Sequence, residues 1–388
     1  MTTTTDIEYS LEANPISFTE ALKITANTKR HLLLGNGFSI ALFRDRFSYV
    51  SLLEKADFTG FPEARKAFDL LGTTDFEVVI HALRQSIAIL PLYSADSDAR
   101  SRMEEHAETL KELLVRAIAG RHPERPSDVT EGQYQACRRF LAHFAGESRN
   151  LKPKMGKDLR ANIYTLNYDL LLYWTLLHDQ VIDWNASVPL TSVIKSVEAL
   201  QHDDGFRAPD DDPGAAYVTW DGEETHYQCI FFLHGGLHLY DYGHELQKKC
   251  WERSGGIPLV DQIRASLNEG RFPLFVSEGS SQGKFERIRH SAYLHKGLRS
   301  FAEICRTAGA SLFIFGHSLA SKDAHILRQI EKGKIGQVYV SLYGDPASDS
   351  NMAIVARARR MAAVRNERYP LDVHFFEAAS ANVWGETA

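Results

Sequence analysis

Cysteine is scarce in this 388-residue chain, and the cysteines that are present lie far apart. They are Cys137, Cys229, Cys250 and Cys305. None of them belongs to one of the close pairs from which structural zinc sites are built, so we expect no zinc ribbon. A chain of this length buries about three quarters of its unfolded surface, and its core needs neither a disulfide nor a metal. This cysteine usage fits a reducing cytosol.

Long apolar runs and a surplus of positive charge are absent as well. No run approaches the roughly 18 residues of a membrane span, and the start, MTTTTDIEYS, has no charged leader before an apolar stretch. We therefore expect a cytoplasmic protein. The formal net charge is −6. Because such a chain has no global positive field, nucleic acid is not expected as its primary ligand.

The chain does contain short apolar runs that alternate with helix-length segments. The runs cover residues 31–34, 163–166, 229–233, 274–276, 312–315 and 338–342. This alternation predicts an α/β fold, with a Rossmann-like, mostly parallel sheet and helices on both of its faces. We expect a single domain over residues 1–388.

Two insertions are expected in this domain. The first is helical and covers about residues 60–155. It includes an amphipathic helix over 74–92, in which Thr74 and Glu77 match a capping box, and further helices over about 103–118 and 132–145. The second covers about residues 240–300. Its basic residues from Lys284 to Arg299 indicate a solvated helix face, or alternatively a contact for nucleic acid or a protein partner.

Ligands of open parallel sheets bind beyond the carboxyl ends of the strands. The first run ends in Gly35-Asn36-Gly37-Phe38-Ser39. Glycines allow close approach of backbone to a ligand, and the N-terminus of a following helix would offer N–H groups to a phosphate. A merely structural tight turn is the alternative.

The second run ends in Asn167-Tyr168-Asp169. Asn167 and Asp169 would offer an amide and a carboxylate to a polar ligand at the strand end. Asp169 would otherwise cap the helix that begins at Leu170. Spacing leaves both readings open.

The third run ends in His234-Gly235-Gly236. A histidine at a buried strand end, followed by two glycines, is well placed to act as a general base near neutral pH, although a hydrogen-bonded core histidine is the alternative. His238 and His244 follow, but no nearby carboxylate or cysteine completes a ligand set, so no metal is expected.

The fourth run leads into Gly316-His317-Ser318-Leu319-Ala320. Gly316-x-Ser318-x-Ala320 is close to the elbow that exposes a nucleophilic serine, and Asp345 and His374 follow in the order of an α/β-hydrolase triad. A serine hydrolase with Ser318 as nucleophile is therefore one alternative. Ala320, however, stands where that elbow normally has glycine, and the hydrolase reading gives no role to the first two motifs.

Taken together, GNGFS, TLNYD, LHGG and FGHSLASKD resemble the sirtuin-like (silent-information-regulator-type) superfamily, and more closely its bacterial NAD-cleaving branch of antiphage defence. The resemblance implies that Gly35, Asn36, Gly37, Phe38 and Ser39 line the pyrophosphate of NAD. It places Asn167 and Asp169 at the nicotinamide end, and His234 near the nicotinamide ribose. It assigns Gly316 and Ser318 to the adenosine side.

Departures from the superfamily narrow this expectation. Deacylating sirtuins carry a zinc module with two close cysteine pairs, and the absence of these pairs here makes protein deacylation less expected. The turn Ser341–Gly344 lacks the asparagine that often meets adenosine, so it is not assigned to the cofactor. The segment 273–302 has no deacylase counterpart.

The resemblance therefore implies an NAD glycohydrolase with NAD as substrate and no metal cofactor. It further implies a homo-oligomer and, as a possible partner, a HerA-type DNA-translocating ATPase. Two alternatives stay open beside it. One is a regulatory or scaffold module that binds a nucleotide without chemistry, and the other is the serine hydrolase.

Overall fold

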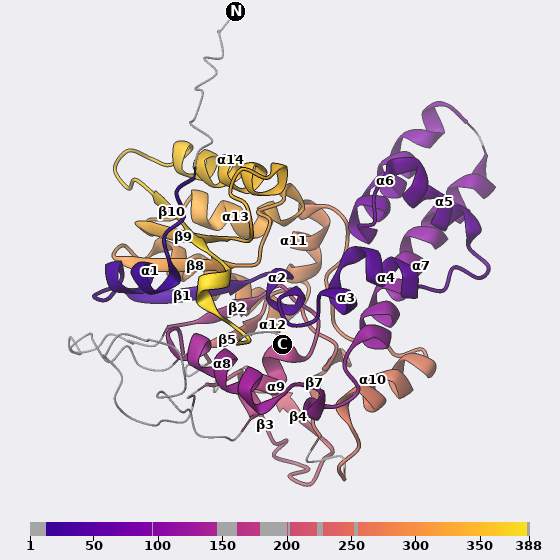
Figure 1. Ribbon diagram of the computed structural model, residues 1–388. Coiled ribbons are helices and arrows are strands. Elements are labelled where there is room, and N and C mark those ends of the chain that lie inside the picture. The colour runs from indigo at the N-terminus through magenta and orange to yellow at the C-terminus, as the bar shows by residue number, and fades with distance from the viewer. Residues whose placement is uncertain are drawn as a thin grey trace, which may run out of the picture.

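The computed structural model describes residues 13–94, 96–145, 161–178, 200, 202–222, 228–251 and 255–385. Its centre is a six-stranded, fully parallel sheet (Figure 1). In spatial order the strands are β10 (Asp372–Glu377), β9 (Gln337–Leu342), β8 (Ala310–Phe315), β1 (Lys29–Leu34), β2 (Ile163–Thr165) and β5 (Ile230–Phe232). The predicted α/β fold with a parallel sheet is thereby confirmed.

The strand order reverses once. From β1 the chain proceeds outward through β2 to β5, then returns to β8 on the other side of β1 and proceeds outward again to β10. This is the strand order of doubly wound, Rossmann-like sheets, whose ligands bind in the crevice at the reversal. Here the reversal lies between β1 and β8, which pair in register from Lys29–Ala310 to Leu34–Phe315. Both strands therefore deliver their following loops to the same point.

Fourteen helices are described in the resolved ranges. They are α1 (Phe18–Ile24), α2 (Gly37–Ile40), α3 (Arg44–Phe47), α4 (Tyr49–Lys55), α5 (Pro62–Leu71), α6 (Phe76–Ile89), α7 (Ser97–Arg121), α8 (Glu131–Ala142), α9 (Leu171–Leu177), α10 (Leu259–Asn268), α11 (Ser281–Arg289), α12 (Ala292–Arg306), α13 (Ala324–Glu331) and α14 (Asp349–Ala363). None of them is both long and apolar enough to cross a membrane.

Helices cover both faces of the sheet. On one face the Phe18 ring of α1 contacts the Phe140 ring of α8 and the Phe313 ring of β8. On the other face the Phe301 ring of α12 meets the edge of Tyr164 in β2. Since successive strand residues point to opposite faces, both sides of β1 and β8 are apolar and buried.

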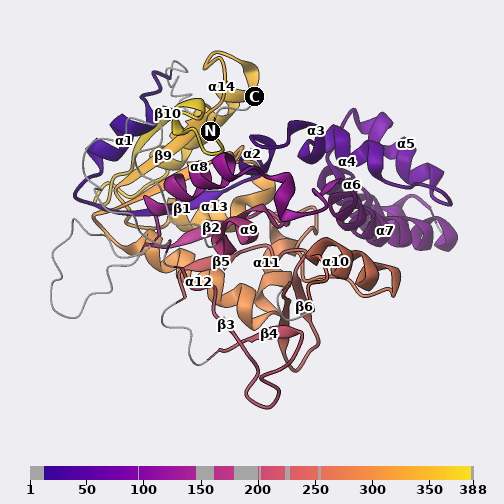
Figure 2. The same ribbon diagram turned by 60° about the horizontal axis from the view of Figure 1, so that its bottom comes forward.

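The helical insertion between β1 and β2 forms a lobe beside the sheet, as both ribbon views show (Figures 1 and 2). Helices α5, α6 and α7 build most of it. The capping box predicted at Thr74 and Glu77 is wrong. Asp75 is the N-cap of α6 and accepts the N–H of Glu77 at 2.9 Å, because its carboxylate lies one residue closer to the helix. The Glu77 side chain is thereby left for other partners.

The region between β5 and β8 contains helices α10 to α12 and part of a second sheet. This antiparallel sheet has the order β3 (Phe206–Arg207), β4 (Tyr217–Trp220), β7 (Leu246–Lys249) and β6 (Leu239–Asp241). It draws two strands from before β5, so it starts earlier in the chain than the insertion predicted over about 240–300.

Two predictions about the main sheet need correction. Residues 274–276 do not form a sheet strand, because Phe275 makes only an isolated bridge to Gly235. The sixth strand is instead β10, whose run of Phe375 and Phe376 lies between charged residues at both ends. A three-residue apolar run carries too little pattern to separate a strand from a buried loop.

Candidate functional site

The loops after β1 and β8 touch at the strand reversal. The Gly37 N–H donates to the Gly316 carbonyl oxygen at 2.8 Å, and the Gly35 N–H donates to that of Phe315 at 2.9 Å. A Cβ on Gly37 would lie 2.5 Å from the Gly316 Cα, and Gly316 has φ 68°. These glycines are therefore required by the approach of two backbones, which is the structural reading of the first motif. The Gly37 N–H is already engaged.

A cavity of about 1250 Å³ opens above the carboxyl ends of the strands at this point. It exceeds the roughly 300–1,000 Å³ of ordinary small-molecule sites, which leaves room for an extended ligand. Of the predicted site residues, those lining the cavity are Gly35, Asn36, Gly37, Asn167, Asp169, His234, Gly316 and Ser318. Four motifs far apart in the sequence thus meet around one space.

Phe38 and Ser39 do not line this cavity. The Phe38 ring packs at 4.9 Å from the Trp384 ring, and the Trp384 indole N–H donates to the Phe38 carbonyl oxygen at 2.8 Å. Ser39 is fully buried and points toward the second motif. Both residues therefore support the residues that line the cavity and do not line it themselves.

Ser39 links Asn167 to Asp169. Its hydroxyl donates to Asp169 Oδ2 at 2.5 Å and accepts from Asn167 Nδ2 at 3.0 Å. Asp169 Oδ1 accepts the Leu171 N–H at 2.9 Å and so caps α9. Burial raises the pKa of the Asp169 carboxyl, while the hydrogen bonds from Ser39 and Leu171 oppose that rise. With its amide nitrogen held by Ser39, Asn167 has its carbonyl oxygen left for a ligand.

His234 lies at the end of β5, with only 2% of its surface exposed. Its ring is inclined by only 25° to that of Tyr168 and 22° to that of His325, with centroids 6.4 and 5.2 Å away. His234 Nε2 is 3.0 Å from His325 Nε2. Burial, followed by the positive charge of Lys284, lowers the pKa of His234 well below its usual range. His234 is therefore a neutral imidazole at pH 7, as a general base must be.

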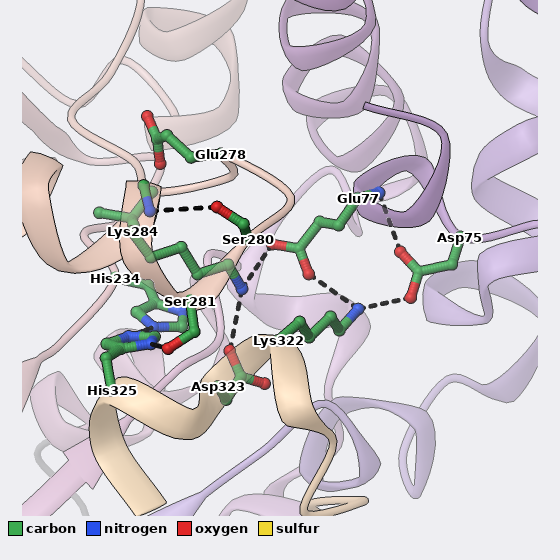
Figure 3. Close-up of polar contacts among 12 residues, drawn as sticks. Asp75, Glu77, His234, Glu278, Ser280, Ser281, Lys284, Lys322, Asp323 and His325 are labelled. Atoms are coloured by element: carbon green, nitrogen blue, oxygen red, sulfur yellow. Dashed lines mark hydrogen bonds and ion pairs between the residues drawn. The ribbon is translucent and has the colours of Figure 1, made fainter. Parts of the chain in front are cut away.

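A buried cluster of charges adjoins His234 (Figure 3). Lys284 Nζ of α11 lies 2.7 Å from Glu77 Oε1 and 2.9 Å from Asp323 Oδ1. Lys322 Nζ lies 2.7 Å from Glu77 Oε2 and also pairs with Asp75. Glu77 and Asp75 belong to the start of α6, so the helical insertion supplies two of the acids beside the site.

Each charge in this cluster depends on its partners. Burial would raise the pKa of Glu77 and of Asp323. Lys284, together with Lys322 at Glu77 and His317 at Asp323, outweighs burial, and both pKa values are lowered. Conversely, burial would lower the pKa of Lys284, and Glu77 and Asp323 raise it instead. All three groups are therefore charged at neutral pH, although their side chains are at least nine-tenths buried.

Metal binding was not expected from the sequence, yet one group of potential ligand atoms does occur. Atoms of His234, Asp323 and His325 lie within 4.8 Å of one another. Asp323, however, already accepts Lys284 on Oδ1 and His317 Nε2, at 3.2 Å, on Oδ2. A cation placed there would face the Lys284 ammonium, so the charges do not favour a metal. His238, stacked on Tyr173, and the exposed His244 lie outside this group.

Sequence reasoning missed several residues of the site. Lys322 and Asp323 are the last two residues of the fourth motif, FGHSLASKD, and His325 follows it closely, so their position was a usable signal. Lys284 was included in a basic, solvated helix face, which is wrong for this residue because its side chain is 1% exposed. Glu77 had no signal, because only the folded chain brings the helical insertion to the strand ends.

The serine hydrolase triad is not assembled. His374 is in register with Tyr339, which is in register with Phe313 in the middle of β8, whereas Ser318 follows the end of β8. Two strand spacings, about 10 Å, separate β10 from β8. The His374 ring instead stacks on Tyr339 at 4.8 Å. Ser318 is exposed and Asp345 accepts the Ala347 N–H.

The family model described as "Domain of unknown function (DUF4917)" matches residues 32–384, and the chain belongs to this family. The match includes all four motifs and both insertions. No curated protein matches the chain. Because the description of the family names no activity, the function has to be argued from the geometry of the site.

Proposed function

We propose that this protein is an NAD glycohydrolase, which cleaves the bond between nicotinamide and ribose to give nicotinamide and ADP-ribose. The observation that carries the proposal is the convergence of Asn167 and His234 on one large cavity at the strand reversal of a Rossmann-like sheet. Such reversals are where dinucleotides bind in this architecture.

In this proposal the dinucleotide lies across the reversal. The nicotinamide end is next to Asn167 and His234, and the pyrophosphate passes the turn Gly35–Gly37. Arg44 also lines the cavity and brings positive charge to its wall. The adenosine end extends past Gly316 and Ser318 toward Tyr343 and Asn351, which line the cavity further along. The turn that the sequence left unassigned is thus given a place on the adenosine side.

The reaction adds water to the anomeric carbon of the ribose while nicotinamide departs. The ribose acquires positive charge as the glycosidic bond stretches, and a dry site that holds nicotinamide in place favours its departure. The Asn167 carbonyl oxygen orients the water or the carboxamide of nicotinamide. His234 accepts the proton that the water loses, directly or through a ribose hydroxyl. Asp169 acts through Ser39 and fixes the orientation of Asn167.

The cellular part of the proposal rests on the resemblance of the four motifs to the NAD-cleaving branch of the sirtuin-like superfamily. An enzyme that destroys NAD acts in the cytoplasm, where NAD is abundant, and it needs restraint. We extend the proposal to an effector of bacterial antiphage defence that depletes NAD, assembles into a homo-oligomer and works beside a HerA-type ATPase. A chain that stays monomeric across micromolar concentrations in analytical ultracentrifugation would contradict the self-assembly part.

The reaction is tested by incubating NAD with the purified protein and separating the products by chromatography. We expect nicotinamide and ADP-ribose in equal amounts. Asn167→Ala is expected to lower the rate at least about a hundredfold, within the usual range for a residue that acts in the transition state. Its melting temperature should stay close to that of the wild type. An Asn167→Ala variant with full activity would remove Asn167 from the mechanism.

The two alternatives give different results in simple assays. A nucleotide-binding module would bind NAD with no dependence on His234 and leave it intact. A serine hydrolase would be labelled at Ser318 by a fluorophosphonate, and Ser318→Ala would abolish its activity. We expect no labelling, and full NAD cleavage by Ser318→Ala apart from a change in KM.

A further inference from the structure

A row of hydrogen-bonded side chains leads from His234 away from the cavity, through His325 to Ser281. His325, the second residue of α13, faces His234 with Nε2 to Nε2 at 3.0 Å and with the two rings inclined by 22°. The other nitrogen of His325, Nδ1, is 3.4 Å from Ser281 Oγ at the start of α11. Figure 3 shows the three side chains in this order. His325 itself does not line the cavity.

The hydrogen bond between two neutral imidazoles requires one donor and one acceptor. If His234 donates its Nε2–H to His325, then His234 Nδ1 carries a lone pair, and the described residues offer this atom no hydrogen-bond partner. His325 then carries its own proton on Nδ1 and donates it to Ser281 Oγ. In this arrangement, of the four ring nitrogens of the two histidines, only His234 Nδ1 has a lone pair available to a substrate, and His234 lines the cavity.

We propose that His325, which acts through His234 and does not touch the substrate, receives a proton from His234 during each turnover. The inference rests on the proposed NAD hydrolysis and names the destination of its proton. His234 Nδ1 takes the proton of the attacking water while its Nε2–H passes to His325 Nε2. His325 is then an imidazolium, and its Nδ1 proton moves to Ser281 Oγ, whose own hydrogen passes to solvent. One proton enters this relay and one leaves it. After product release the resting tautomers return when His234 Nδ1 loses its proton to solvent, the Nε2 proton passes back to His234, and Ser281 returns a proton to His325 Nδ1 and regains its hydrogen from solvent.

The charges around the pair favour this direction. Lys284 of α11, Asp323 of η5 (Ser321–Asp323) and His317 after β8 act on both rings, and Glu77 of α6 acts on His325 as well. After burial, the strongest charge acting on His234 is Lys284, which disfavours a proton there. The strongest charge acting on His325 is Asp323, which favours one. Burial still keeps the resting pKa of His325 at about 4, so His325 is an uncharged acceptor before the reaction.

The kinetic test replaces His325 with glutamine, which can hold the His234 imidazole by a hydrogen bond but cannot pass a proton on. We expect His325→Gln to lower kcat for nicotinamide release about a hundredfold, the lower end of the range for proton transfer. KM should stay within about threefold, since His325 does not line the cavity. The matched control is His290→Gln, an exposed histidine directly after α11, which should leave both constants unchanged.

An outcome in which His325→Gln keeps kcat within threefold of the wild type would overturn the inference, because positioning alone would then suffice. The failure of the proposed function looks different: wild-type protein would release no nicotinamide. Nuclear magnetic resonance of imidazole-¹⁵N-labelled wild-type protein needs neither activity nor a variant that folds. It should find His234 protonated on Nε2 and His325 on Nδ1, whereas a His234 protonated on Nδ1 would overturn the inference.

Discussion

The two carboxylate oxygens of Asp169 have different hydrogen-bond partners. One oxygen caps α9, and the other holds Ser39, which in turn holds the amide of Asn167. The sequence left helix capping and contact with a ligand open as alternatives for Asp169. The structure confirms the cap, and Asp169 also lines the cavity where such a ligand would bind. Gly37 and Gly316 likewise have two roles: they allow two backbones to come into contact, and they line the cavity.

Removal of the buried Lys284 charge should destabilise the fold. Lys284→Met keeps the length of the side chain but leaves the buried Asp323 carboxylate without its ammonium partner, and leaves Glu77 with Lys322 alone. Breaking one partner of a buried pair costs about 3–5 kcal/mol. We expect a loss of this size in the free energy of unfolding at pH 7, measured in urea.

The matched control is Lys23→Met, which removes the same charge from an exposed pair with Glu20 and should cost at most about 0.5 kcal/mol. The pH dependence gives a second check. Without Lys284, burial raises the pKa values of Glu77 and Asp323, so the loss should grow as the pH rises from 5 to 8. Equal losses for the two variants would contradict the account of the cluster.

At the scale of elements, the strand reversal depends on the contact between the loops after β1 and β8. A Cβ on Gly316 would lie 2.6 Å from the Gly37 Cα. The clashing atom belongs to the backbone, so no side chain can move aside to relieve the clash. Gly344 has a similar φ, 73° against 68°, and nothing within 4 Å of its added Cβ. The two positions therefore separate steric exclusion from backbone strain.

We expect Gly344→Ala to cost about 1 kcal/mol of unfolding free energy, from the left-handed backbone alone. Gly316→Ala should cost about 2 kcal/mol more, as overpacking of a closed contact does. Urea unfolding of both variants measures the difference. If the two substitutions cost the same, the two loops are not in the close contact described here.

The strands and helices differ in how well the sequence predicts them. Strands β1, β8 and β9 could be predicted because their apolar runs are four or more residues long and buried on both faces. The run at 274–276 failed because a short apolar segment in a loop has the same pattern, and β10 was missed because its charged ends obscure its core. The position of α6 over the strand ends could not be predicted, since the sequence around Glu77 has no feature that indicates its contact with Lys284.

At the scale of the whole molecule, buried histidines make stability depend on pH. Burial lowers the pKa of His31, His143 and His238 to about 3, and that of His122 and His325 to about 4. The neutral form is also required by hydrogen bonding: His122 Nε2 accepts the Leu170 N–H at 3.0 Å. All five take up protons near pH 6.5 when the chain unfolds.

Because these folded-state pKa values are depressed, their stabilisation is present above about pH 6.5 and is lost as the pH falls toward 4. Each histidine accounts for about 1.4 kcal/mol per pH unit below that point. We expect calorimetry to find a steep fall in Tm from pH 6.5 to 4.5. Asp169 and Glu278, whose pKa values are raised, act with the opposite sign but are fewer. A constant Tm over this range would contradict the burial of neutral histidines.

The whole molecule brings together four motifs that the sequence spreads from Gly35 to Ser318. Their convergence could be predicted from strand order alone, because parallel strands deliver their ends to one edge. The charge of Lys284, the strongest that acts on His234 after burial, could not be predicted, since it comes from α11 and lies outside those motifs.

The central claim is that this convergence cleaves NAD, and the most direct measurement follows binding and cleavage in the same samples of wild type and His234→Ala. We predict that calorimetry detects NAD binding to both proteins, while chromatography detects nicotinamide from the wild type and at least about a hundredfold less from the variant. Wild-type protein that binds NAD and leaves it intact would contradict the claim. A His234→Ala variant that cleaves NAD as fast as the wild type would contradict the role of His234 as the general base.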